Sequence, residues 1–472
     1  MPGFKQIDKQ DIAFFESILP KERVLTGDNI NEDFTRDEMT EYGTFAPGVV
    51  LTVMNTREVS DILRYCNGRR IPVTPRGAGT GLCGGCVAIY GGVLLDVSRM
   101  KKLVEIDKVN MTATVEPGLM LMEFQKLLEG TGLFYPPDPG EKSATVCGNI
   151  MTNAGGMRAV RYGVTRDYVL GMEVVLADGT VQQLGGKVVK TSSGYNLMQL
   201  LCGSEGTLCV LTQATVKLIP EPLANLSLLA PFDSLEKCVE AVPKILSCGC
   251  EPTAVEFMEK EVIQAAEEYL GKQFPDKSAD AYLLLRLDGA EESLIEPRLE
   301  AVTDLLLASG ANDVLLADTD ERKMSIWDAR GAFLEAIKNS TVSMDECDVV
   351  VPRERIADFV RFSRRVSAEN QLRIRSFGHA GDGNLHLYLC RDDYPDDVWK
   401  EKRAAAMQQL YDAARDMGGD VSGEHGIGHA KAKYLEESVG DVQIALMRGI
   451  KQVFDPKGIL NPGKVIRRVK AD

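Results

Sequence analysis

The sequence predicts an α+β fold of two domains, the second of which combines an open sheet with covering helices. The chain has 472 residues, and at about 150 residues per domain this exceeds one ordinary core. Residues 49–97 alternate strand-like and helix-like segments. Beyond residue 220 the pattern changes to longer strands separated by long amphipathic helices, which is typical of an α/β layer arrangement. We therefore expect a domain boundary near Pro220.

Composition excludes several classes of protein. The formal net charge is −15, which disfavours a nucleic-acid partner because phosphate binding depends on dense Lys and Arg. The first 20 residues mix charges among apolar residues and lack the h-region of a signal peptide, and no apolar run of about 18 residues predicts a membrane span. The 11 cysteines are an odd number spread over the chain, which indicates thiols in a reducing compartment. We expect a cytoplasmic protein.

The first domain opens with a strand, helix, strand pattern. Residues 49–54 and 71–75 are expected strands, and 57–69 an expected helix whose apolar side chains follow i, i+3, i+4, i+7 spacing after the capping candidates Asn55 and Thr56. The glycine-rich segment 76–97 then passes directly into a strand ending at Val97. Rossmann and Walker loops place their glycines before a helix. Neither motif is therefore predicted here.

Further elements complete both domains. Strand TATVEPG and a short helix over 120–128 precede a long loop at 135–156, and strands then continue to Pro220. Loops of this length are usually functional or disordered, and the β patterns on both sides favour function. In the second domain we expect strands TAVEFM, AYLLLRLDG and NDVLLAD, with helices around 259–270 and 292–309. A last helix ends near Phe454.

All four histidines fall in two short segments. His379 and His386 lie in FGHAGDGNLHLYL, where two glycines predict a tight turn that brings both imidazoles together and Asp382 shapes the turn. His425 lies in SGEHGIGHAK beside Glu424, and extended neighbours point to opposite sides. Two imidazoles and one carboxylate can hold Zn, Fe or Mn with open positions. The alternative is a set of hydrogen-bonded core histidines, and we expect a structural or supporting role for His429.

The loop from Arg76 to Gly85 offers successive backbone N–H groups without side-chain obstruction, which suits a pyrophosphate. A flexible surface turn is the alternative. Cys83 and Cys86 in this loop have CxxC spacing, but no second CxxC completes a four-cysteine site. We interpret both as small packing residues.

Six motifs in order resemble the flavin-linked 2-hydroxy-acid dehydrogenases. This family includes the glycolate oxidase flavin subunit, D-2-hydroxyglutarate dehydrogenase and D-lactate dehydrogenases, and has the vanillyl-alcohol-oxidase-type FAD fold. The stretches MDECDVVVPR and WDARGAFLEA look most similar to the lactate dehydrogenase subunit that works with electron-transfer flavoprotein in an electron-bifurcating complex. The six motifs are PRGAGTGLCGG, PPDPGEKSATVCGNIMTNAGGMRAVRYGVTRD, GSEGTL, GHAGDGNLH, GEHGIG and NPGK.

The resemblance implies a two-subdomain FAD-binding domain over 1–220, a cap or substrate domain over 221–420, and a segment 421–472 that returns to the FAD domain. FAD would be noncovalent, since no histidine precedes position 379. Its pyrophosphate would lie against the glycine loop. The implied FAD contacts are Pro75, Arg76, Gly77, Ala78, Gly79, Thr80, Gly81, Leu82, Ser143, Thr145, Gly148, Asn149, Thr152, Ala154, Gly155, Gly206 and Asn461.

For the reaction, the resemblance implies a divalent metal (Fe, Zn or Mn) on His379, His386 and Glu424 that binds the substrate's hydroxyl and carboxylate. His425 would take the hydroxyl proton while the C2 hydrogen passes to the flavin. Arg330 would hold the substrate carboxylate, with Lys464 as a supplement. The alternative for Arg330 is a solvated helix surface.

Departures from the 2-hydroxyglutarate enzymes favour a monocarboxylate. This chain has Tyr388 where they carry asparagine and Glu346 where they carry lysine. We expect oxidation of lactate, with D-lactate favoured, and transfer of electrons to the two-subunit electron-transfer flavoprotein. Alternatives are a glycolate or D-2-hydroxyglutarate dehydrogenase with another acceptor, or a noncatalytic FAD relay subunit.

Overall fold

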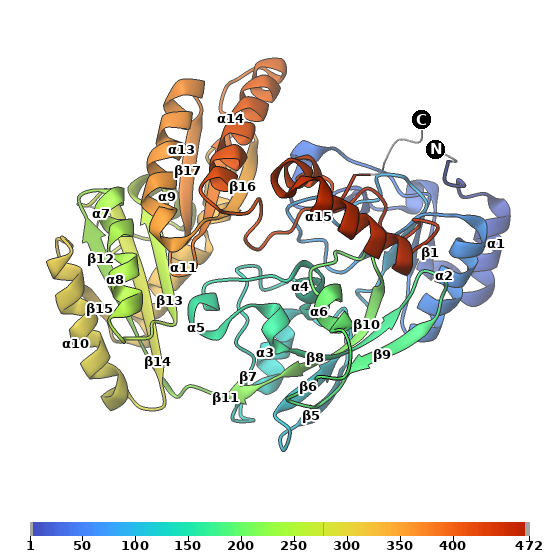
Figure 1. Ribbon diagram of the computed structural model, residues 1–472, viewed down its shortest axis with the longest axis horizontal. Helices are drawn as coiled ribbons and strands as arrows, with labels where there is room; N and C mark the ends of the chain where they lie inside the picture. The colour runs from blue at the N-terminus through green and yellow to red at the C-terminus, as the bar shows by residue number, and fades with distance from the viewer. Residues whose placement is uncertain (1–2, 277, 468–472) are drawn as a thin grey trace. The chain divides into compact units, whose positions relative to one another are not determined.

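The computed structural model describes residues 3–276 and 278–467. The chain divides into two compact units (Figure 1). Of the described residues, unit 1 contains 3–154, 164–221 and 425–467, and unit 2 contains 155–163, 222–276 and 278–424. The prediction assigned residues 155–163 to the first domain, whereas their contacts belong to unit 2. Local sequence pattern could not reveal this, because the segment is a short loop and helix whose partners are distant in sequence.

Unit 1 begins with a four-stranded sheet in the order β1-β2-β4-β3, in which only the β1–β2 pair is antiparallel. Its apolar side chains form a core with the helix that the sequence predicts, which Asn55 caps by accepting from the Glu58 N–H at 3.0 Å. The strand after the glycine loop is also confirmed. These elements are α1 (Lys9–Ile18), β1 (Val24–Leu25), β2 (Val49–Thr52), α2 (Thr56–Arg69), β3 (Val73–Arg76) and β4 (Val93–Asp96).

A five-stranded antiparallel sheet in the order β5-β6-β10-β8-β9 forms the second half of unit 1, beside a small β11-β7 pair. Two short helices, α3 and α6, connect its strands. The elements are β5 (Leu103–Asp107), β6 (Thr112–Val115), α3 (Leu121–Leu128), β7 (Leu133–Phe134), β8 (Val169–Val175), β9 (Val181–Gly185), α6 (Leu197–Leu201), β10 (Val210–Lys217) and β11 (Ile219–Pro220).

The prediction of a continuous loop over 135–156 is wrong in part, because helix α4 (Val146–Thr152) lies within it. The Thr145 hydroxyl accepts from the Gly148 N–H at 3.1 Å and caps the helix. Val146, Cys147 and Ile150 are buried on one side. A seven-residue helix with a glycine shows too little periodicity to be recognised in a Gly- and Ser-rich stretch.

The C-terminal segment returns to unit 1 as helix α15 (Ala432–Phe454), which bends at Gly440 where φ is 79°. Leu460 then pairs with Val73 of β3, and the Asn461 N–H donates to the Val73 carbonyl at 2.7 Å. This places the terminal motif beside the strand that leads into the glycine loop.

Unit 2 is built on one seven-stranded antiparallel sheet in the order β15-β12-β14-β13-β17-β18-β16. The open sheet predicted for this part of the chain is therefore present. Its strands are β12 (Ala224–Phe232), β13 (Ala254–Glu259), β14 (Ala281–Gly289), β15 (Leu315–Ala317), β16 (Met344–Val350), β17 (Arg373–His379) and β18 (Asn384–Cys390).

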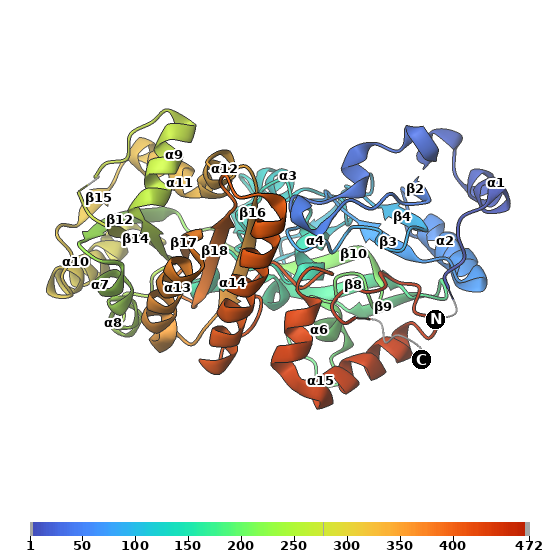
Figure 2. The same ribbon diagram turned by 90° about the horizontal axis from the view of Figure 1, so that it is seen from above.

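Helices cover both faces of this sheet (Figure 2). One layer contains α9 (Lys260–Leu270), α11 (Asp320–Gly331) and α12 (Phe333–Asn339), and the other contains α7 (Leu235–Glu240), α8 (Val242–Ser247), α10 (Glu292–Ala308), α13 (Ile356–Asn370) and α14 (Asp396–Asp416). Short helix α5 (Ala159–Tyr162) also belongs to this unit. None of the helices in the described ranges is both long and apolar enough to span a lipid bilayer.

Candidate functional site

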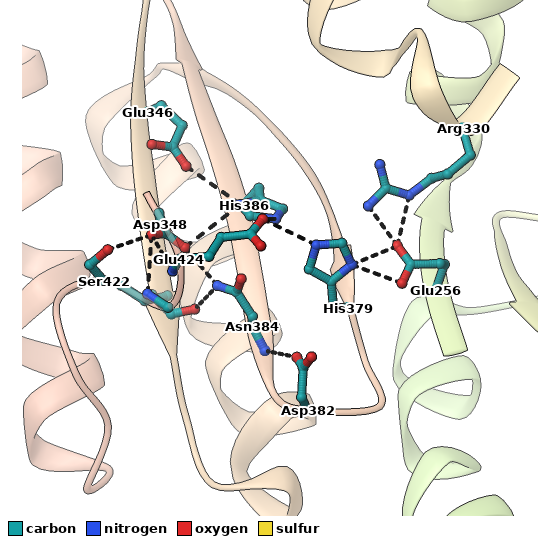
Figure 3. Close-up of polar contacts among 12 residues, drawn as sticks. Glu256, Arg330, Glu346, Asp348, His379, Asp382, Asn384, His386, Ser422 and Glu424 are labelled. Carbon is teal, nitrogen blue, oxygen red and sulfur yellow. Dashed lines mark hydrogen bonds and ion pairs between the residues drawn. The ribbon is translucent and has the colours of Figure 1, made fainter. Parts of the chain in front are cut away.

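One face of the unit 2 sheet carries a cluster of polar side chains from four neighbouring strands, β13, β17, β18 and β16 (Figure 3). In the register of these strands Glu256 lies opposite His379, and Asp348 lies opposite His386. Directly opposed residues share a face of the sheet. Two carboxylates therefore flank two imidazoles, and all four residues are at most 5% exposed.

The two histidines face each other across a hairpin, as the glycine pattern predicts. The hairpin joins β17 to β18, and Asp382 supports it by accepting from the Asn384 N–H at 3.1 Å. Gly383 has φ of 90°, which favours glycine, and an added Cβ would lie 2.2 Å from the Val351 carbonyl. The ring centroids of His379 and His386 are 5.2 Å apart.

Both imidazoles point at the same carboxylate oxygen. The Nε2 atoms of His379 and His386 each lie 3.2 Å from Oε1 of Glu424. Ligand atoms bound at about 2.0–2.2 Å to one tetrahedral ion are roughly 3.3 Å apart, so this spacing fits a shared divalent cation. These three residues form one of the clusters in the described chain that could hold a metal ion.

The position of His379 between two carboxylates strengthens this fit. Its Nδ1 lies 2.8 and 2.9 Å from the two carboxylate oxygens of Glu256. If the proton of a neutral His379 is on Nδ1, the lone pair of Nε2 faces Oε1 of Glu424 at 3.2 Å. Nε2 and Oε1 would then both be acceptors, and a proton or a cation must lie between them. Burial alone lowers the pKa of His379, but Glu256 and Glu424 outweigh it and hold the pKa well above its usual value. The site therefore favours positive charge at this point.

Asp348 positions Glu424. Its Oδ2 accepts from the Ser422 hydroxyl at 2.7 Å and from the N–H groups of Gly423 and Glu424 at 3.1 Å each. Its Oδ1 accepts from the Asn384 amide at 2.6 Å. One buried carboxylate thus ties the 422–424 segment to strand β18 and directs Glu424 at both imidazoles.

Arg330 is buried beside this cluster, so the surface alternative for it is wrong. The residue is 6% exposed, and its guanidinium pairs with Oε2 of Glu256 through Nε at 2.8 Å and Nη2 at 2.6 Å. It also lies over the Phe377 ring at 4.5 Å. Glu256 therefore links Arg330 to His379.

The glycine loop of unit 1 has the form expected of an anion cradle. Among the described residues, none accepts a hydrogen bond from the backbone N–H groups of residues 77–81. Gly79 has φ of 82°, and a Cβ there would meet the Arg76 guanidinium. Arg76 itself donates to the carbonyls of Asp33 and Arg36 at 2.8 Å each. The Arg76 side chain thus holds the segment 33–36 in place. The backbone N–H groups of the loop form the surface that a phosphate can approach.

Other predicted cofactor residues surround this loop in unit 1. A Cβ on Gly77 would lie 2.7 Å from the Thr145 hydroxyl, and one on Gly206 would lie 3.0 Å from Pro75. The Asn461 amide donates to the carbonyls of Gly85 and Glu205 at 2.7 Å each. Gly155 belongs to unit 2, where an added Cβ would lie 2.8 Å from Glu424. The other predicted residues lie in the glycine loop or in segment 143–154 of unit 1: Ala78, Thr80, Gly81, Leu82, Ser143, Gly148, Asn149, Thr152 and Ala154.

The remaining predicted residues lie in unit 1. Lys464 is 2% exposed and donates to the Val87 carbonyl, and burial lowers its pKa to about 8. His425 is half-buried, and the division between the units falls between it and Glu424. The His429 ring nitrogens lie 3.2 and 3.3 Å from the carbonyls of Gly84 and Tyr42, which agrees with a structural role. Neither cysteine of the CxxC belongs to a metal-ligand cluster of the described chain.

The chain matches two family models, the FAD binding domain over residues 47–185 and the C-terminal domain of FAD linked oxidases over 221–465. The chain belongs to the FAD-linked oxidases. A D-lactate dehydrogenase from Anaerostipes hadrus is 49% identical over 98% of each chain, and the glycolate oxidase subunit GlcD of Bacillus subtilis (strain 168) is 38% identical over 92% of each. The resemblance found in the motifs is therefore confirmed at the level of the family.

Solved structures confirm the fold class of this FAD-linked oxidase. p-Cresol methylhydroxylase with bound substrate superposes with a TM-score of 0.81, 19% identity and coverage of 98% and 99% of the two chains. The 4-ethylphenol oxidase of Gulosibacter chungangensis superposes with a TM-score of 0.77, 20% identity and coverage of 97% and 96%. The predicted vanillyl-alcohol-oxidase-type arrangement is thus correct. The glycine loop described above lies within residues 47–185, which match the FAD binding domain.

Two residues of the polar cluster, Glu256 and Asp348, were not predicted from the sequence. Glu256 lies in the predicted strand TAVEFM, where an acidic residue among apolar neighbours was a usable signal. Asp348 lies in MDECDVVVPR, in which three acidic residues interrupt a buried strand. Buried carboxylates are costly without partners, so such positions indicate a polar site.

Proposed function

We propose that this FAD-linked oxidase oxidises D-lactate to pyruvate, with a divalent metal ion held by His379, His386 and Glu424. The observation that carries the proposal is the convergence of two imidazole nitrogens on one carboxylate oxygen of Glu424. The 49% identical relative carries the name D-lactate dehydrogenase. A noncatalytic relay subunit would need no such cluster.

Charge balance supports a cation at this position. Four carboxyl groups, those of Glu256, Glu346, Asp348 and Glu424, lie against two imidazoles and Arg330. Burial raises the pKa of Glu424, but His379 and His386 outweigh it and lower the pKa well below its usual value. Ionised carboxylates in a buried site are costly unless paired. A divalent ion would offset this excess of negative charge.

In the proposed reaction, the ion would supply Lewis acidity at the substrate hydroxyl and FAD would supply a two-electron acceptor. His425 takes the hydroxyl proton, because it directly follows a ligand and an imidazole can exchange protons near neutral pH. Arg330 binds the substrate carboxylate while Glu256 holds its Nε and Nη2 groups. Lys464 remains a supplementary candidate.

The substrate would be a monocarboxylate. Glu346 is 1% exposed and its Oε1 lies 3.5 Å from His386 Nδ1. Its register partner Tyr388 is also buried and stacks on Phe377 with ring centroids 5.3 Å apart. An acidic and an aromatic side chain at these positions disfavour a second substrate carboxylate. Glycolate is the second candidate, since a 38% identical relative is named as a glycolate oxidase subunit.

The reduced flavin would pass its electrons to electron-transfer flavoprotein, as part of an electron-bifurcating complex. The motif resemblance supports this acceptor. In addition, no cluster of the described residues that could hold a metal contains cysteine. An iron–sulfur acceptor within the described chain is therefore not indicated.

Anaerobic flavin bleaching tests the substrate and the acceptor together. We expect D-lactate to bleach the flavin of the purified holoenzyme at least about tenfold faster than D-2-hydroxyglutarate, since one uncompensated like-charge contact costs on the order of 1.4 kcal/mol. L-lactate and glycolate complete the panel. Reoxidation should follow addition of electron-transfer flavoprotein. Faster bleaching by glycolate would identify glycolate as the substrate instead of D-lactate. Bleaching by none of the acids would favour the noncatalytic relay subunit.

Replacing Glu256 with Gln should weaken metal binding about 10- to 100-fold, because partners of a ligating histidine commonly contribute this much. The shape of the side chain is kept, but His379 loses the carboxylate that orients its ring. A chelator competition assay measures the change. Glu259→Gln, at the end of the same strand, is the matched control because Glu259 pairs with the Ser376 hydroxyl. Equal affinities in the two variants would contradict the role of Glu256.

A further inference from the structure

Two cysteines in unit 2 lie close together, outside the site described above. Cys248 and Cys250 flank Gly249 in a CGC sequence that follows helix α8. The sulfur atoms lie 3.1 and 3.3 Å from the same acceptor, the carbonyl oxygen of Ile245. Two sulfurs that share one acceptor atom are within reach of each other.

The backbone of this turn is shaped for the approach. Cys248 ends the helix, and Gly249 has φ of 82°, a left-handed conformation that folds the chain back. Arg298 of α10 then fixes the following residues by donating to the carbonyls of Cys250 and Glu251 at 2.7 and 2.9 Å. The backbone around both cysteines is therefore held by defined contacts.

The two thiols differ in exposure. Cys248 is exposed, whereas Cys250 is 1% exposed. Burial, and then the neighbouring Cys248 thiol, raise the pKa of Cys250 to about 12. A reagent in solution therefore meets Cys248 first, and Cys250 can react only with a group already attached beside it.

We propose that Cys248 and Cys250 form a reversible redox pair that reacts with small-molecule disulfides. The Cys248 thiolate attacks the disulfide, forms a mixed disulfide and releases one thiolate. Cys250 then loses its proton and attacks the Cys248 sulfur, which closes the intramolecular disulfide and releases the second thiolate. The two protein thiols are oxidised by two electrons, and the small disulfide is reduced to two thiols. This inference does not depend on the proposed function.

The short ring makes the bond labile. A disulfide between residues two apart closes a small, strained loop, and strained or exposed disulfides are more easily reduced than structural ones. The pair is therefore dithiol in strongly reducing conditions and closes as the surroundings become more oxidising. Cys238 is fully buried, so a reagent in solution cannot reach it as it reaches the exposed Cys248.

The test equilibrates the full-length holoenzyme in oxidised and reduced glutathione buffers, traps free thiols with N-ethylmaleimide and analyses tryptic peptides by mass spectrometry. Peptide 245–260 contains Cys248 and Cys250 and no other cysteine. In the wild type we expect this peptide to change from doubly alkylated to internally bridged with a two-electron dependence on the buffer ratio. Cys250→Ser should instead accumulate glutathione on Cys248, and Cys248→Ser should remain singly alkylated.

Two results would overturn the proposal. One is a stable glutathione adduct on Cys248 of the wild type, which would mean that Cys250 cannot displace it. The other is a wild-type peptide that stays doubly alkylated in the same buffers in which Cys248 of the Cys250→Ser variant becomes modified. The Cys250→Ser variant keeps the nucleophile Cys248 and removes only the ring closure, so it separates reactivity from pairing.

Discussion

Replacing His386 with Ala is expected to remove the bound metal and lower kcat/KM by about 10³-fold or more. A metal ion contributes several kcal/mol to such a reaction, and each ~1.4 kcal/mol corresponds to a factor of ten. His386 supplies one of the nitrogen atoms that lie 3.2 Å from Glu424. Metal analysis and steady-state kinetics measure the two effects, and the flavin absorbance reports that FAD remains.

Stability provides a readout of the same change that does not depend on activity. Added metal raises the Tm of a protein whose folded state binds it, so we expect a metal-dependent Tm shift in the wild type and none in His386→Ala. Cys390→Ala is the matched control, because this buried residue lies on the same strand and face four positions further. A full metal complement in His386→Ala would contradict the assigned ligand set.

Replacing His425 with Ala should abolish flavin reduction by lactate while FAD and metal stay bound. General bases contribute about 10²- to 10⁴-fold to rates. His425 is half-buried and directly follows Glu424 in the chain. The rate of anaerobic flavin bleaching measures the effect, and the absorbance spectrum and metal analysis confirm that both cofactors remain.

Rescue distinguishes a base from a merely structural residue. Free imidazole should restore part of the bleaching rate of His425→Ala, and the acidic limb of the pH profile should disappear in the variant. A structural role would give neither effect. If lactate bleached the flavin of His425→Ala as fast as that of the wild type, His425 would not be the general base. The proposed metal ligands would not be affected by that result.

Local signals predicted the parts of both sites that are close in sequence. The glycines between His379 and His386 predicted a turn, and the hairpin places the two rings together. The glycine loop after Arg76 leads into a strand, as expected. Such features follow from backbone freedom and from the two-residue period of strands, which the sequence displays directly.

Local signals failed where the segment was short or its partners distant. Helix Val146–Thr152 offered too few turns to show a period within a glycine- and serine-rich stretch. Residues 155–163 looked continuous with the first domain, yet their contacts lie in unit 2, where Arg161 donates to the Asp288 carbonyl at 2.8 Å. The first failure came from the shortness of the helix, and the second from partners that are distant in the chain.

The sequence by itself determined the family, the glycine loop and the pair of imidazoles. Only the tertiary structure decided which carboxylates surround those imidazoles. Glu256 contacts His379 across 123 residues of chain, and Asp348 reaches the Glu424 N–H across 76. Strand order and register create these contacts, and a register shift of one residue would turn each carboxylate to the opposite face of the sheet. Long-range pairing is set by the packing of the whole sheet, which no local pattern encodes.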